Sequence, residues 1–244
     1  MADTTEIAWT DSTFNPWWGC SKVGPGCDHC YAESLDKRTG GDHWGPDKTP
    51  RVMSGDNWRK PARWNRIAEA SGTRRRVFCG SMCDWADKNA PDGQRDRLWE
   101  LIRTTPALDW QLLTKRAPRI AECLPADWGD GYNNAWLGVT VENRKHGLPR
   151  IEHLQRVPAQ IRFLSVEPLL EDIGEIDLGG IHWVIVGGES GHGARPMEAA
   201  WVENIRRQCE AAGVAFFFKQ WGGRVGKGGC LLDGAELKQW PRAA

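Results

Sequence analysis

The chain has 244 residues and a formal net charge of zero, with 32 basic and 32 acidic side chains. This length allows one large domain or two small ones, and the balanced charge supplies no overall attraction to nucleic acid or membranes. Residues 1–6 are polar and acidic and no apolar run reaches membrane-spanning length, so we expect no signal peptide and no membrane anchor. A reducing cytoplasm is therefore expected, and there the clustered thiols among the eight cysteines serve metals or catalysis more often than disulfides.

The first motif along the chain is a loop over residues 19–32 with three cysteines, Cys20, Cys27 and Cys30, spaced C-x6-C-x2-C. A Gly-Pro-Gly run at 24–26 makes the first gap flexible and prone to turns. Three thiolates on one short loop can hold a metal and leave one coordination position unfilled, as a site meant for chemistry requires. Iron–sulfur chemistry with an exchangeable fourth ligand is therefore the first hypothesis.

The alternative for these cysteines is a zinc knuckle completed by His29, His43 or another cysteine. A structural zinc ion needs a fourth protein ligand, and no candidate lies at a standard spacing. His29 is too close in sequence to Cys27 and Cys30 to join them comfortably. Cluster ligation is preferred over zinc and, because of the expected compartment, over disulfide pairing.

The next segment, residues 39–76, is interpreted as a basic excursion near the cysteine loop. Its first part is rich in Gly, Asp and Pro, as expected for a long functional loop. Residues 51–76 carry eight basic and two acidic side chains, together with Trp58 and Trp64. Such a segment can hold phosphates and stack bases of a nucleic acid or nucleotide. An ordinary solvated helix explains it about equally well, since the basic residues between 59 and 66 recur at helical spacing.

Apolar strand candidates then alternate with helical segments. The expected strands cover residues 76–79, 109–113, 135–139, 161–164, 182–186 and 214–218, with an opening strand near 7–9. The expected helices cover residues 94–103, 117–124, 143–155 and 201–212, and 169–180 is expected to be a loop. Continuous apolar runs are typical of parallel strands buried on both faces. The pattern predicts a single α/β domain over residues 1–244, a complete or partial parallel barrel of the TIM type, with a doubly wound open sheet as the alternative.

Each strand candidate ends in hydroxyl, carboxylate or ammonium groups, and three successive strands are followed by glutamates, Glu142, Glu167 and Glu189. Strand ends lie at the surface, which alone explains about half of these polar residues. In parallel barrels, however, the active site lies at the carboxyl ends of the strands. We therefore expect a polar ligand there, in contact with Ser81, Asp84, Thr114, Lys115, Glu142, Ser165, Glu167, Gly187, Gly188 and Glu189.

Seven stretches spread over nearly the whole chain carry a family resemblance: residues 7–17, 19–33, 113–116, 137–143, 163–169, 186–191 and 218–222. On these stretches the chain resembles a phage- and prophage-associated three-cysteine-motif family that is itself similar to radical S-adenosylmethionine (SAM) enzymes. Radical SAM enzymes commonly space their cysteines C-x3-C-x2-C, so the second gap matches and the first is longer. The string Gly187-Gly188-Glu189 looks like a radical SAM motif but follows the sixth expected strand and not the second.

The resemblance implies a 4Fe–4S cluster on the three cysteines and SAM at its open iron, with an external electron donor. Reduction would then cleave SAM to a 5′-deoxyadenosyl radical. Lys115 would meet the methionine carboxylate, and Glu142 or Glu167 would take ribose or amino groups. Cys83 would donate a hydrogen atom to a substrate radical, against the alternative that it simply packs.

The phage association of the family favours a nucleic acid or nucleotide as substrate, bound through the basic residues 51–76. The competing function is a nucleic-acid-binding module that is stabilised by zinc or by a cluster and has no catalytic activity. Metal content separates the two, because the enzyme requires iron and sulfide whereas the module is expected to carry zinc.

Overall fold

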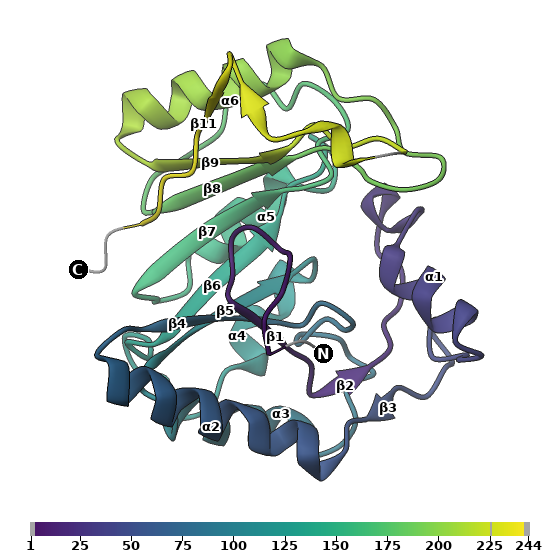
Figure 1. The fold of residues 1–244 in the computed structure, drawn as a ribbon, viewed down its shortest axis with the longest axis vertical. Coiled ribbons are helices and arrows are strands. Elements are labelled where there is room, and N and C mark those ends of the chain that lie inside the picture. The colour runs from purple at the N-terminus through teal and green to yellow at the C-terminus, as the bar shows by residue number, and fades with distance from the viewer. Residues whose placement is uncertain (1–2, 225, 242–244) are drawn as a thin grey trace.

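A computed structural model describes residues 3–224 and 226–241. Its centre is a seven-stranded parallel sheet in which every strand pairs with its predecessor in the order β1-β4-β5-β6-β7-β8-β9. The sheet curls into an open half-barrel with β1 and β9 as its edges (Figure 1). The strands are β1 (Ser12–Phe14), β4 (Arg75–Cys79), β5 (Leu108–Thr114), β6 (Ala135–Thr140), β7 (Ile161–Val166), β8 (Trp183–Gly187) and β9 (Ala215–Gln220). The predicted fold class, a partial parallel α/β barrel, is confirmed.

Helices cover the convex outer face of the half-barrel, and one helix stands apart from them (Figure 1). The outer helices are α2 (Gly55–Ser71), α3 (Gln94–Arg103), α4 (Ile120–Cys123), α5 (Leu148–Gln155) and α6 (Ala199–Ala212). The separate helix, α1 (Tyr31–Arg38), lies beyond the carboxyl ends of the strands. Two short pairs complete the fold, β2 (Trp17–Trp18) with β3 (Arg51–Val52) and β10 (Leu231–Leu232) with β11 (Ala235–Glu236). No described helix is both long and apolar enough to cross a membrane.

Two separate apolar cores hold the sheet in place. The larger core packs the outer helices against the convex face. The smaller one fills part of the hollow of the half-barrel with buried aromatic and aliphatic side chains: Trp9, Phe78, Trp136, Ile161, Phe163, Trp183, Ile185 and Phe217. Aromatic side chains bury large areas and pack edge to face, as Trp183 and Phe217 do with ring centroids 5.9 Å apart. The hollow is therefore packed and is not a pore.

The structure corrects some of the expected element boundaries. The opening strand is Ser12–Phe14, whereas residues 7–9 form a turn that places Trp9 in the inner core. The helix expected from residue 143 begins at Leu148, because residues 143–147 form a turn in which the Gly147 amide donates to the Asn143 carbonyl at 2.9 Å. The expected helix at 117–124 is a short 3-10 turn followed by α4.

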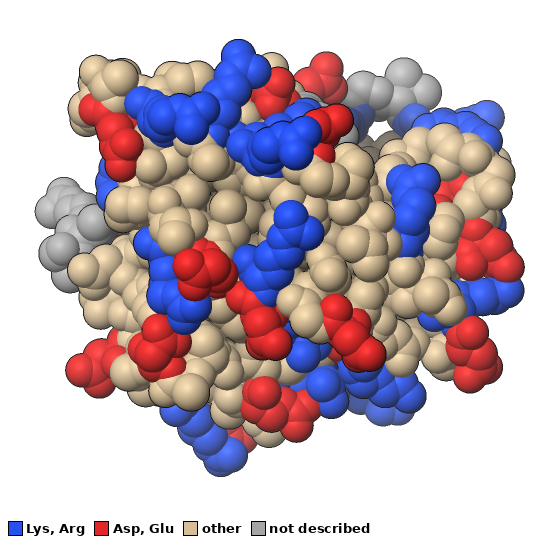
Figure 2. All heavy atoms as spheres, turned by 90° about the horizontal axis from the view of Figure 1, so that it is seen from below, with Lys and Arg blue, Asp and Glu red and all other residues tan. Residues whose placement is uncertain are grey.

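The basic excursion begins as a loop over residues 39–54, interrupted only by β3, and continues as an ordinary helix. Helix α2 starts after Ser54, whose hydroxyl accepts a hydrogen bond from the Asn57 amide. Trp58 and Trp64 are only 5% and 2% exposed and belong to the outer core, so the expectation that they stack on bases is wrong. Basic and acidic side chains alternate over the face seen from below, the side on which α2 lies in Figure 1 (Figure 2). The solvated-helix alternative describes this segment.

The close packing of the inner core gives a test at Gly138. This residue lies opposite Phe163 in the register of β6 and β7, and a Cβ at Gly138 would come 2.3 Å from the Phe163 ring. We expect Gly138→Ala to lower the free energy of unfolding by about 1–3 kcal/mol, because an overpacked core must shift its side chains or backbone. Urea unfolding measures the change.

Gly55→Ala is the matched control, since Gly55 is exposed at the start of α2 and the nearest atom to its added Cβ is an Arg59 guanidinium nitrogen at 3.4 Å. This variant should stay within about 0.5 kcal/mol of the parent protein. Equal stability of the two variants would mean that Phe163 does not pack on β6.

Candidate active site at the mouth of the half-barrel

A cavity of about 530 Å³ opens at the carboxyl ends of the strands, above the inner core. Ile7, Trp9 and Phe78 form part of its lining, and the cysteine loop contributes another part. Most of the residues expected from the sequence line this one cavity: Cys20, Cys27, Cys30, Ser81, Cys83, Asp84, Thr114, Lys115, Ser165, Glu167, Gly188 and Glu189. Glu142 and Gly187 do not. The strand ends and the cysteine loop thus meet in space although they are far apart in sequence.

The three cysteines of the loop are free thiols of intermediate exposure. Cys27 ends a short 3-10 turn, and Cys30 directly precedes α1. Within residues 3–224 and 226–241, no three His, Cys, Asp or Glu side chains gather closely enough to hold a metal ion. Three soft thiolate donors suit an iron–sulfur cluster in chemical type, and binding one requires residues 20–30 to draw their thiols together.

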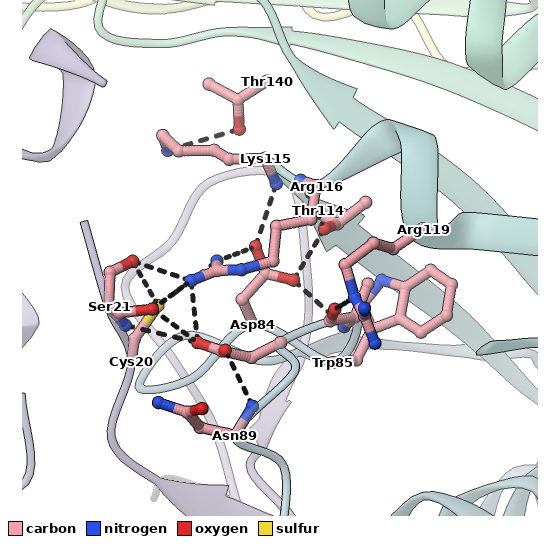
Figure 3. A network of polar contacts seen from close by, with 12 residues as sticks. Cys20, Ser21, Asp84, Trp85, Asn89, Thr114, Lys115, Arg116, Arg119 and Thr140 are labelled. Atoms are coloured by element: carbon pink, nitrogen blue, oxygen red, sulfur yellow. Dashed lines mark hydrogen bonds and ion pairs between the residues drawn. The ribbon is translucent and has the colours of Figure 1, made fainter. Parts of the chain in front are cut away.

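Arg116 fastens the cysteine loop to the end of β5 (Figure 3). Its side chain is 7% exposed, and the guanidinium donates to Asp84 at 2.9 Å and to Asp87 at 2.7 Å. It also donates to the Ser21 carbonyl at 2.7 Å and lies 3.6 Å from the Cys20 sulfur. Buried charges persist only when they are paired and hydrogen-bonded, and removing one partner typically costs about 3–5 kcal/mol. The start of the cysteine loop is therefore held firmly.

Asp84 is the anionic centre of this network. One of its carboxylate oxygens accepts from the Thr114 hydroxyl at 2.6 Å, and the other accepts from the Lys115 amide at 3.0 Å. Burial, reinforced by the Asp84 charge, raises the pKa of the Cys20 thiol. A metal that binds Cys20 must displace its proton, and the Arg116 guanidinium beside the sulfur favours the resulting thiolate.

A second contact joins the cysteine loop to the end of β8. The Glu189 carboxylate accepts from His29 Nδ1 at 3.0 Å and from the Arg195 guanidinium at 2.6 and 2.9 Å. Burial alone would raise the pKa of Glu189, but hydrogen bonds from Arg195 and His29 outweigh burial and lower the pKa to about 2. Glu189 therefore stays ionised and already has cationic partners, which suits a role in positioning the loop.

Glu142 differs from the expectation that it contacts a cofactor. Its side chain is fully buried and forms an ion pair with Arg150, which lies on α5. A Cβ added to Gly26 would lie 3.0 Å from the Glu142 carboxylate, so Glu142 packs beneath the cysteine loop. Gly187 likewise does not line the cavity, and a Cβ added there would lie 3.3 Å from the carboxylate carbon of Glu167. Both residues support the site from outside it.

The cavity carries more positive charge than its carboxylates neutralise. Asp84 and Glu189 are paired as described, and Glu167 pairs with Lys219. Lys115 Nζ donates to the Thr140 hydroxyl at 3.3 Å, and neither Lys115 nor Lys227 has a carboxylate partner among the described residues. Unpaired ammonium groups at a half-enclosed cavity favour a ligand that carries a carboxylate or phosphate.

Cys83 lines the cavity beside the start of the cysteine loop, where it forms a β-bridge with Gly19, and its thiol lies 3.8 Å from the Asn15 side-chain oxygen. Burial, together with the nearby Cys79 thiol, raises the pKa of the Cys83 thiol, which therefore remains protonated. Sequence reasoning assigned no role to Arg116, Asp87, Arg195 or Lys219. Arg116 lies two residues after the end of β5 and Lys219 is the penultimate residue of β9, so both lie at carboxyl ends of strands, which is the signal that identified the other site residues.

Two solved structures of spore photoproduct lyase are similar to this chain in fold. One is a double mutant with bound AdoMet and dinucleoside spore photoproduct, with a TM-score of 0.51 and 12% identity over 85% of this chain and 63% of that one. The other is complexed with dinucleoside spore photoproduct, with a TM-score of 0.47 and 12% identity over 79% of this chain and 58% of that one. The chain thus spans less than two thirds of those proteins.

The first of these similarities agrees in fold with the partial parallel α/β barrel expected from the sequence. No curated protein is significantly similar in sequence. One family model covers residues 4–241, nearly the whole chain, and the phage association expected from the sequence stays a prediction. The chain belongs to this family, which is described as proteins of unknown function, DUF5131.

Proposed function

We propose that the protein is a radical SAM-like iron–sulfur enzyme that cleaves SAM reductively and acts on a nucleic acid or nucleotide. The observation that carries the proposal is the meeting of three cysteines from one loop with the unpaired Lys115 ammonium at a single cavity. A closed zinc site would need four protein ligands and no adjoining space, whereas about 530 Å³ adjoins these thiols. The cavity is large enough for a small-molecule ligand.

Cys20, Cys27 and Cys30 would hold the cluster as thiolates. When bound, the cluster would supply the one electron, taken from an external donor, for reductive cleavage of SAM to methionine and a 5′-deoxyadenosyl radical, which would take a hydrogen atom from the substrate. Lys115 binds the methionine carboxylate, and Glu167, held by Lys219, accepts from the amino group or the ribose. The aromatic floor below the cavity keeps water from the radical.

Cys83 serves as the hydrogen-atom donor that ends the substrate radical. Its raised pKa keeps the hydrogen on sulfur. Transfer breaks the S–H bond, forms a C–H bond on the substrate and leaves a thiyl radical. One electron from the external donor and one proton return this radical to the thiol.

Removal of the three proposed ligands tests the cluster assignment. Anaerobically purified protein should contain iron and sulfide and be brown, and replacement of Cys20, Cys27 and Cys30 by alanine should abolish both the iron and the colour. Cys230→Ala is the control, because Cys230 lies outside the cavity and bonds Glu236 at 3.2 Å. Stoichiometric zinc in the parent protein, or iron retained by the triple variant, would contradict the assignment.

Charge removal at Lys115 tests the SAM site. Lys115→Gln loses a charge-assisted contact with the methionine carboxylate, which should cost on the order of 1.5–3 kcal/mol and weaken SAM binding roughly ten- to hundredfold. Equilibrium dialysis of the cluster-loaded protein measures the affinity, and release of methionine and 5′-deoxyadenosine after dithionite reduction measures cleavage.

The control for this prediction is Lys145→Gln. Lys145 is exposed in the turn after β6, does not line the cavity and has no ion-pair partner among the described residues. Its variant should bind SAM like the parent protein. If both lysine variants bind SAM equally well while the cluster is intact, Lys115 does not contact the cofactor.

A further inference from the structure

A second cavity of about 520 Å³ is lined in part by residues 21–23 at the start of the cysteine loop and has no role in the proposed SAM chemistry. Its lining includes Lys88 and Arg119, together with the apolar Val23 and Pro46. Four residues line both this cavity and the one at the mouth of the half-barrel: Ser21, Lys22, Trp44 and Arg116. The two cavities are therefore neighbours, separated by the side chains of those shared residues.

Basic side chains outnumber acidic ones in the second cavity. Lys22, Lys88, Arg116 and Arg119 line it, against the single carboxylate of Glu33. Arg116 is neutralised by Asp84 and Asp87, and Glu33 divides its charge between Lys22 at 3.3 Å and Lys37 at 2.6 Å. Lys88 is exposed and has no ion-pair partner in the described part of the chain. This ammonium is available for an anion in the cavity.

An aromatic surface lies beside these cations. Trp44 is partly exposed and lines both cavities. The backbone that follows Trp44 is held in place, since the Gly45 amide donates to the Cys20 carbonyl at 3.0 Å and Asn89 donates to the Pro46 carbonyl at 2.7 Å. Positive charge beside an accessible aromatic ring is the combination that binds single-stranded nucleic acids, through phosphate contacts and base stacking. A site for a bare inorganic anion would need no aromatic surface.

We propose that the second cavity binds the phosphate and base of a nucleotide adjacent to the one that reacts. The substrate class is then single-stranded nucleic acid, with one nucleotide in the cavity at the mouth of the half-barrel and its neighbour against Trp44 and Lys88. This assignment rests on the proposed function of the first cavity. It places nucleic-acid contacts at the cysteine loop and not on the basic helix α2, whose tryptophans are buried.

Binding of a fluorescein-labelled short single-stranded oligodeoxynucleotide to the cluster-loaded protein, followed by anisotropy, tests this proposal. Lys88→Gln should weaken binding about tenfold and reduce the salt dependence by about one phosphate contact. Trp44→Leu should weaken binding about tenfold as well, and Trp44→Phe should restore most of the affinity, because stacking needs an aromatic ring. The matched control is Arg66→Gln, since Arg66 is exposed on α2, has no ion-pair partner among the described residues and should not contribute.

SAM binding of the same variants separates this proposal from the proposed function. Unchanged oligonucleotide affinity in Lys88→Gln with normal SAM binding overturns the second site alone. An equal loss in Arg66→Gln also overturns it and moves the contact to α2. A nucleoside monophosphate that competes as well as the oligonucleotide indicates a free nucleotide and overturns the assignment to nucleic acid.

Two further outcomes are informative. If Lys88→Gln slows reduction by an acidic electron-transfer protein and leaves oligonucleotide binding unchanged, the cavity serves the electron donor and the proposal is wrong. If the parent protein binds the oligonucleotide through Lys88 but never binds SAM, the nucleotide site stands and the enzymatic function falls.

Discussion

The buried Arg116 guanidinium, held between Asp84 and Asp87, is the interaction on which the candidate site depends. The cysteine loop has little regular structure, so its position must come from side-chain contacts. Arg116 supplies one such contact by donating to the Ser21 carbonyl. Its partner Asp87 accepts from the Ser21 amide, and its partner Asp84 accepts from the Lys115 amide directly after β5. Because all three charges are buried, loss of Arg116 would leave both carboxylates without their cationic partner, at a cost of several kcal/mol. The sheet and the loop are thereby coupled.

Two other contacts attach the cysteine loop on either side of its middle. The Gly19 amide donates to the Met82 carbonyl at 3.0 Å, and His29 bonds Glu189. Between them, the glycines at 24 and 26 pack over Glu142 without side chains of their own. Arg195, which bonds Glu189, also donates to the Pro25 carbonyl at 3.0 Å, so the loop is attached in its middle as well as at its ends. Drawing three thiols together at a cluster therefore requires a local rearrangement of residues 20–30. The aromatic core in the hollow gives the cavity a dry floor.

Features that depend on a local sequence pattern were predicted well. Continuous apolar runs located six strands of the main sheet, and the rule that parallel barrels carry sites at strand ends located most of the residues lining the cavity. Prediction from the sequence failed for residues whose role depends on a contact with a distant part of the chain. Glu142 and Glu167 look alike in sequence, yet Glu142 is buried against Arg150 while Glu167 faces the cavity. Trp58 and Trp64 lie among charged residues in the sequence, but both are on the buried face of α2 and belong to the larger apolar core. Such pairings have no local signal.

Electron paramagnetic resonance of the dithionite-reduced protein, titrated with SAM, tests the central claim most directly. Three thiolate ligands leave one iron of a 4Fe–4S cluster without a protein ligand, so SAM is expected to change the spectrum of the reduced cluster. The change should saturate at one SAM per chain. A cluster spectrum that SAM does not alter would indicate a structural or electron-transfer cluster. Protein that contains zinc and gives no iron signal would contradict the iron–sulfur site itself.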